Sequence, residues 1–179
     1  MSRIAPVPDL ERSGYTNTGY FKDEEKITNM KRILAHSPAS LQAYMQWYPL
    51  YGEIKKILGE RNAYLYAFAI STAADCGLCA TIFRKLLVDA GENPEQLLLS
   101  TEEKDLVDFG TAIARYNGNI ANSVYNSIAK KYAKDEMVTL VAFAGQMIAS
   151  NIFNNVVETD VDEYLKAYQP AVRSIWRDA

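Results

Sequence analysis

The segment from Arg61 to Ala74 constrains the fold of this chain more than any other. Its middle, AYLYAFAI, is apolar on nearly every side of a helix and lacks the alternation of apolar and polar residues that marks a half-buried strand. A helix that is apolar on most faces has to be covered by other elements. The sequence therefore predicts a central buried helix over 61–74 with further elements packed around it.

Sequence signals for helix starts and ends precede this segment. An acidic first turn from Asp23 suits the positive end of a helix dipole and predicts a first helix there. Ser37 and Pro38 have the residue types of an N-cap and a first helical position, and they predict a second helix. The apolar stripe of this helix continues in phase through Pro49 up to Gly59, which predicts one kinked helix rather than two.

Similar signals follow the central segment. Asp75 is predicted to cap a helix that Gly91 ends, and Ser100 with Glu103 forms a capping-box pattern. No stretch reads as a convincing strand, so the predicted fold class is all-α. The other predicted elements are a helical turn over 93–99, helices over 100–116, 120–133 and 135–157, and an amphipathic piece over 161–176. Small residues on one face of the 135–157 helix predict close contact with another helix.

The length of 179 residues predicts a single helical domain over 1–179. Residues 1–22 are rich in proline and glycine, and they predict an extended N-terminal arm lying on the surface or on a neighbouring subunit. The net charge of −3 argues against a nucleic-acid partner, because phosphate contacts need clustered Lys and Arg. The longest apolar run, Ala63 to Ile70, is far shorter than the roughly 20 residues of a membrane span, and the start lacks the apolar stretch of a signal peptide. These observations predict a soluble cytoplasmic protein with no membrane partner.

The two cysteines stand in a Cys76-Gly77-Leu78-Cys79 motif, a spacing that two randomly placed cysteines would reach about once in a hundred chains. Residues three apart on a helix are neighbours, so the sulfurs can form and break a disulfide, and a helix N-terminus stabilises a thiolate. The carboxylate of Asp75 acts in the opposite direction and raises a thiol pKa. Gly77 leaves access to Cys76, so we expect a moderately reactive thiol there.

Two other interpretations of the pair remain open. Small apolar cysteines can simply pack the start of a helix. A metal site would need more ligands than Cys76, Cys79 and His36 supply, so we predict no metal. Because the glycines stand singly and form no phosphate-binding turn, we also predict no cofactor.

The chain resembles the carboxymuconolactone decarboxylase superfamily, in its alkylhydroperoxidase D-like branch. The resemblance rests on the opening MSRIAPV, the segment RILAHSP, the apolar helix leading into the Cys-x-x-Cys motif, and NIFN at 151–154. It implies an all-helical fold, homo-oligomers such as trimers or hexamers, and thiol-dependent reduction of peroxides or of a partner's disulfide.

The chain departs from the redox-active branch at two positions. There a histidine follows the second cysteine by four residues and a glutamate precedes the first by twelve, and together they relay a proton. In this chain those positions hold Phe83 and Tyr64, and a small insertion would align Asn62 instead, with Glu60 one turn back. Phe83 would make the surroundings of Cys79 drier and its thiolate harder to form.

Four residues are candidates for a supporting role. His36 can act as a base or serve only in a helix-capping segment. Tyr64 can donate a proton or be a core aromatic, and Glu60 lies near it. Arg84 can attract an anion or steady a thiolate, or it can be a solvated surface residue.

The leading hypothesis is an antioxidant oxidoreductase of peroxiredoxin-type activity, in which Cys76 and Cys79 cycle between dithiol and disulfide with an external thiol donor. The alternative is a non-catalytic oligomeric scaffold or binding protein that has lost the proton relay. Lactone decarboxylation is a third interpretation, for which no general acid or base is identifiable.

Overall fold

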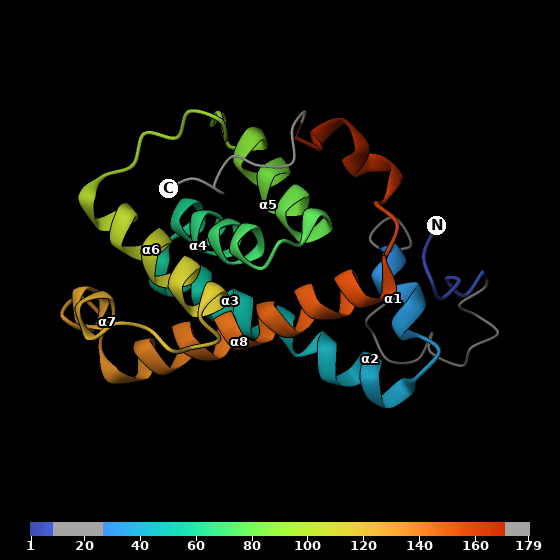
Figure 1. Cartoon of the computed structure of the whole chain (residues 1–179), viewed down its shortest axis with the longest axis horizontal. Coiled ribbons are helices and arrows are strands. Elements are labelled where there is room, and N and C mark those ends of the chain that lie inside the picture. The colour runs from blue at the N-terminus through green and yellow to red at the C-terminus, as the bar shows by residue number, and fades with distance from the viewer. Residues whose placement is uncertain (9–26, 171–179) are drawn as a thin grey trace.

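The structure is a computed structural model that describes residues 1–8 and 27–170. Within those ranges every regular element is helical, which confirms the predicted all-α fold class (Figure 1). The helices are α1 (Asn29–Leu34), α2 (Pro38–Met45), α3 (Trp47–Leu58), α4 (Glu60–Ala73), α5 (Gly77–Asp89), α6 (Thr101–Arg115), α7 (Asn122–Ala129), α8 (Lys134–Val157) and the 3-10 helix η3 (Glu163–Tyr168). The predicted acidic turn at Asp23 and the part of the last helix beyond 170 lie outside the described residues.

Helix α4 is the central helix that its all-round apolar sequence predicts. It packs against α3, α5, α6 and α8. The hydroxyl of the fully buried Tyr66 donates to the backbone oxygen of Leu140 in α8 at 3.2 Å. On the other side Gly110 of α6 approaches the Tyr66 ring so closely that a Cβ would lie 2.9 Å from it. Only glycine lets α4 and α6 come this close.

Helix α8 runs along the molecule and joins its two ends (Figure 1). The Tyr44 hydroxyl of α2 donates to the backbone oxygen of Ala149 at 3.3 Å, and Phe153 packs on the small core under α1 and α2. Residues 1–8 lie against the same end, where the Arg3 N–H donates to the Val157 oxygen at 2.8 Å. The described part of the predicted arm therefore lies on its own chain, while residues 9–22 of the arm are outside the described residues.

The prediction of one kinked helix over 38–58 is wrong. The chain forms two helices, α2 and α3, that meet at Gln46. Pro49 lies in the first turn of α3, where a backbone N–H has no partner within the helix and its loss costs nothing. The apolar stripe stays in phase across both helices, which is why periodicity alone did not reveal the break.

Three further expectations are corrected. Helix α1 begins only at Asn29 behind Thr28, so Ile27, which the predicted first helix includes, lies outside it. Asp75 does not cap α5, because its φ of 53° places it in the left-handed region and Cys76 is the N-cap. Residues 93–99 hold a turn and no helix. The Ser100–Glu103 capping box is present, with the Ser100 N–H donating to Glu103 at 2.8 Å.

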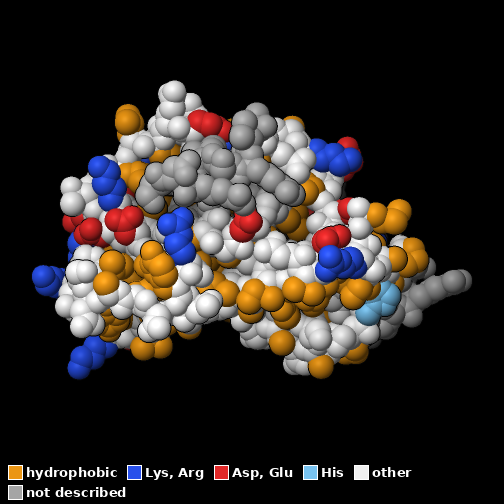
Figure 2. All heavy atoms as spheres, in the orientation of Figure 1, with side chains coloured by type: hydrophobic (Ala, Val, Ile, Leu, Met, Phe, Trp, Pro, Cys, Tyr) orange, Lys and Arg blue, Asp and Glu red, His pale blue; other side chains and the backbone are white. Residues whose placement is uncertain are grey.

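Most of the small-residue face of α8 is exposed among the described residues, so the predicted close contact with another helix is absent along most of its length. Val138 is 69% exposed and Ile152 is 57% exposed, and the space beside Gly145 is open. Hydrophobic side chains gather along α8 on the face shown in Figure 2. By length and composition α8 could also cross a membrane, a property that core helices of soluble proteins share.

Candidate dithiol site

The dithiol lies at the junction of α4 and α5. After α4 ends at Ala73, the left-handed Asp75 reverses the chain, and the Cys76 N–H donates back to the Ser71 oxygen at 3.0 Å. Cys76 then has the extended backbone of an N-cap, and its Sγ accepts the backbone N–H of Cys79 at 3.5 Å. The first cysteine thus occupies the place that Ser or Asp takes at most helix starts.

The two thiols differ in their tendency to ionise. The pKa of Cys76 is lowered, first because the Cys79 thiol donates a hydrogen bond to it and then because backbone N–H groups of Cys79 and Leu78 do so, against the effect of burial. Asp75 raises this pKa as the sequence predicts, but it is the smallest cause. The pKa of Cys79 is raised well above its usual value by its hydrogen bond to Cys76 and by burial. Cys76 is therefore the thiol that ionises first, and Cys79 is the one that keeps its proton to higher pH.

Both sulfurs are covered. Cys76 is 1% exposed and Cys79 is 5% exposed, so the expectation that Gly77 leaves Cys76 accessible is wrong. Leu165 of η3 is fully buried against the two cysteines, and Val161 packs beside it. Gly77 itself is exposed, but η3 and the preceding loop close over the sulfur. In this conformation the Cys76 side chain is therefore closed to solvent.

Asn154 belongs to the site, although the sequence analysis did not name it as a candidate site residue. Its side-chain amide nitrogen donates to Cys79 Sγ at 3.3 Å and to Met30 Sδ at 3.4 Å. The side chain comes from the buried face of α8 and only 4% of the residue is exposed. Asn151, one turn earlier, is also fully buried. Two amides on an otherwise apolar helix face were the signal that could have identified this site.

The two positions at which the resemblance implies a proton relay hold aromatic side chains packed in or against the core. Phe83 is 2% exposed, and its ring lies 6.4 Å from Trp47 and 6.1 Å from Tyr51. Tyr64 is partly buried against the same core, and burial is the first cause that raises its pKa. Neither position offers a base at neutral pH.

The other candidates have partners away from the sulfurs. Nε2 of the exposed His36 lies 2.9 Å from the Ala5 oxygen in the N-terminal segment. Glu60 is 70% exposed and lies 3.7 Å from Lys55. Arg84 is not a solvated surface residue, because its side chain is 15% exposed and forms an ion pair with Glu95. None of these three has a described contact with either thiol.

Comparison with solved structures decides the fold. The debrominase Bmp8 superposes with a TM-score of 0.72 at 14% sequence identity, covering 92% of this chain and 95% of that one. A cysteine-to-alanine variant of Bmp8 in complex with 2,3,4-tribromopyrrole gives 0.71 at 16% identity, covering 92% and 94%. An alkylhydroperoxidase AhpD core, an uncharacterized peroxidase-related protein from Ralstonia eutropha JMP134, gives 0.63 at 15% identity over 92% and 94%. The chain has the alkylhydroperoxidase D-like fold. No protein-family model matches the sequence, and no curated protein matches it.

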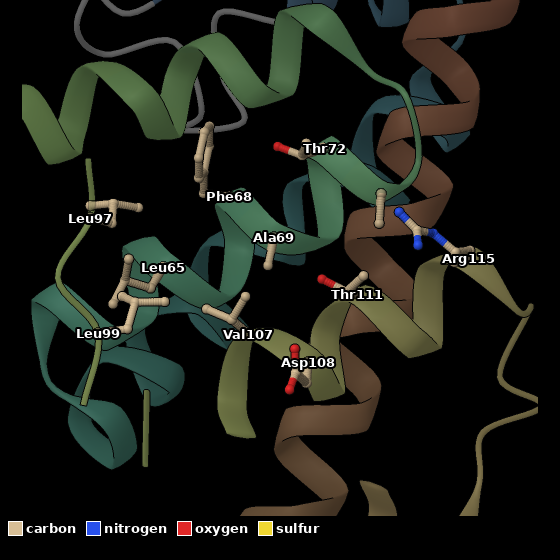
Figure 3. A pocket seen from close by; sticks show the side chains of 11 residues that line it. Leu65, Phe68, Ala69, Thr72, Leu97, Leu99, Val107, Asp108, Thr111 and Arg115 are labelled. Atoms are coloured by element: carbon tan, nitrogen blue, oxygen red, sulfur yellow. The ribbon is translucent and has the colours of Figure 1, made fainter. Parts of the chain in front are cut away.

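The chain also has a pocket of about 140 Å³ between α4 and α6. Leu65, Leu97, Leu99 and Val107 gather at one end of it, and Thr72, Thr111 and Arg115 lie toward the other end (Figure 3). Neither cysteine lines this pocket. Among residues 1–8 and 27–170 no group of three His, Cys, Asp or Glu side chains could hold a metal ion.

Proposed function

We propose that this chain is a thiol-dependent oxidoreductase whose Cys76 and Cys79 cycle between dithiol and disulfide. The observation that carries the proposal is the N-cap position of Cys76 Sγ, which accepts the Cys79 N–H at 3.5 Å. Thiolates at helix N-termini are stabilised by the backbone N–H groups and the helix dipole, and the thiolate is the attacking form. The lowered pKa of Cys76 and the raised pKa of Cys79 give the two sulfurs different roles.

The proposed reaction has three steps. The Cys76 thiolate attacks the terminal oxygen of a hydroperoxide, which gives a Cys76 sulfenic acid and an alkoxide that takes up a proton. The Cys79 sulfur then attacks the sulfenic acid, which forms the disulfide and, with one proton, releases water. An external dithiol donor reduces the disulfide by exchange and is itself oxidised to a disulfide.

The finer parts of the proposal follow from the same chemistry. A protein disulfide is the second substrate class, because a thiolate attacks it in the same way. A cytoplasmic location would supply reduced thiol donors. The resemblance to the alkylhydroperoxidase D-like branch implies that the working form is a homo-oligomer, a trimer or hexamer. No cofactor takes part.

The alternative is a non-catalytic scaffold or binding protein of the same fold. Two observations favour it, the burial of both sulfurs and the aromatic Phe83 at the relay position. A buried dithiol that never opens would neither label nor turn over.

The test is consumption of alkyl hydroperoxides and disulfides by the wild-type protein with a panel of thiol donors. A brominated pyrrole joins the panel because a debrominase shares the fold. We expect turnover with the wild type, none with Cys76→Ser, and a single turnover that leaves a trappable sulfenic acid on Cys76 with Cys79→Ser. Thr101→Ser, a conservative change in α6, is the control. No turnover with any substrate, together with thiols that stay unreactive in the native protein, favours the scaffold.

A further inference from the structure

The side-chain amide of Asn154 donates hydrogen bonds to two sulfurs. Its nitrogen donates to Cys79 Sγ at 3.3 Å and to Met30 Sδ at 3.4 Å. A thioether sulfur can only accept, so the contact with Met30 requires that the NH₂ side of the amide faces the sulfurs. The two hydrogens of this nitrogen account for both contacts, so one of them points at Cys79 Sγ.

The position of Asn154 is fixed by the end of α8. The Thr159 N–H donates to the Asn154 backbone oxygen at 3.0 Å, where the left-handed Glu158 ends the helix. The side chain is buried beside Cys79, away from competing water. In such surroundings a hydrogen bond to a charged group is stronger than at the surface.

Cys79 is the thiol whose ionisation a hydrogen-bond donor would assist. It has to lose its proton before it attacks a sulfenic acid on Cys76, and it leaves again as a thiolate when the donor reduces the disulfide. Its hydrogen bond to Cys76 and its burial both oppose ionisation, and Asn154 is the contact that favours it. The relay histidine is absent, since Phe83 occupies its position.

We propose that Asn154 is a positioning residue for the dithiol, whose amide N–H holds Cys79 Sγ beside Cys76 and stabilises it whenever it carries the negative charge. This inference rests on the proposed function, and it assigns to a neutral amide part of the task that a proton relay performs elsewhere. The amide takes no proton itself. It lowers the free energy of the Cys79 thiolate by a charge-assisted hydrogen bond.

The test measures the titration of Cys79 in a Cys76→Ala background, through the ultraviolet absorbance of the thiolate. Asn154→Leu removes the donor at similar volume, and Asn154→Asp replaces it with an acceptor. A hydrogen bond to a charged group is worth about 10- to 100-fold in an equilibrium, so the Cys79 pKa should rise by about one to two units in Asn154→Leu and by more in Asn154→Asp. With Cys76 present, Asn154→Leu should prolong the life of the Cys76 sulfenic acid by a similar factor.

Two matched controls separate this role from a structural one. Asn151→Leu changes an equally buried amide on the same face of α8, with no described contact to sulfur. Asn155→Leu removes the neighbouring amide, which donates to the Ala74 oxygen at 3.2 Å instead. We expect the Cys79 titration to stay unchanged in both.

Each outcome decides one claim. An unchanged Cys79 pKa in both Asn154 variants, or an equal shift in Asn151→Leu, overturns the inference even where the wild type turns over peroxide. If Asn154→Leu does not fold, Asn154→Asp carries the test alone. If the Asn154 variants shift the Cys79 pKa while the wild type reduces no substrate, the positioning role stands and the proposed function is overturned.

Discussion

Cys76 Sγ accepts the backbone N–H of Cys79 at 3.5 Å, so the first cysteine of the motif is the N-cap of the helix that carries the second. This contact gives the two cysteines different positions relative to the start of the helix. The same short segment that brings the sulfurs together also places Cys76 at the positive end of the α5 dipole. Cys79 lies one turn further into the helix. The motif is therefore asymmetric by backbone geometry, before any substrate arrives.

The first prediction concerns the order of alkylation. Cys76 should react before Cys79 with limiting iodoacetamide, because its pKa is lowered by donation from Cys79 and from the backbone. A lowered pKa keeps the thiolate present at lower pH, so the labelling rate of Cys76 should level off below the pH at which an ordinary thiol does. Mass spectrometry of the labelled peptide measures both the order of alkylation and the pH dependence of the Cys76 labelling rate. Preferential labelling of Cys79 contradicts the assignment of Cys76 as the thiol that ionises first.

The second prediction concerns the cover over the thiols. Leu165→Ala should increase the alkylation rate of Cys76 several-fold, because Leu165 is fully buried against the pair. Removing a buried leucine side chain also costs roughly 2–5 kcal/mol of unfolding free energy. Leu98→Ala is the matched control, since Leu98 is 89% exposed. Rates are compared under native conditions, and equal rates in the wild type and Leu165→Ala would show that η3 does not limit access.

The third prediction concerns the absent proton relay. Phe83→His places an imidazole one helical turn from Cys79, and Tyr64→Glu adds a carboxylate to orient it. General-base assistance is worth about 10²–10⁴ in rate, so the double variant should gain at least about tenfold in peroxide reduction. Loss of the packed ring and burial of a carboxylate each cost roughly 1–4 kcal/mol.

Phe83→Leu is the control for this relay, because it opens the same aromatic cluster without supplying a base. Steady-state peroxide consumption by the wild type, Phe83→Leu and the double variant gives the comparison. A folded double variant that gains nothing shows that positions 64 and 83 are not the relay positions in this chain.

The fourth prediction concerns self-association. Val138, Val141, Ile152 and Val156 on α8 are between 45% and 69% exposed, and a Cβ at Gly145 would meet nothing within 4 Å. A homo-oligomer should bury this face, because exposed apolar patches on helices mark interaction surfaces. Light scattering should report an oligomer for the wild type and a smaller species for Val138→Glu. Leu98→Glu, which places a charge at the exposed Leu98, is the control. A monomeric wild type at micromolar concentration contradicts the prediction.

The sequence determined the features that depend on local contacts. The all-round apolar Arg61–Ala74 segment was enough for a buried central helix, and Ser100 with Glu103 was enough for a capping box, because periodicity and capping act over one or two turns. The Cys-x-x-Cys spacing likewise placed both sulfurs at the start of a helix, where the structure has Cys76 as the N-cap. Pro49 misled because a proline in a first turn and a proline at a kink leave the same apolar stripe.

Only the tertiary structure decided the environment of the dithiol. Asn154 lies 75 residues from Cys79 in the chain and reaches it because α8 packs across the junction of α4 and α5. Leu165 covers the sulfurs from a segment that follows α8, which is why the exposed Gly77 did not make Cys76 accessible. Hydrogen bonds and burial between distant segments depend on how whole helices pack, and a local pattern contains no measure of that. The motif set the chemistry that is available, and the packing of α8 and η3 set the ionisation and access of each sulfur.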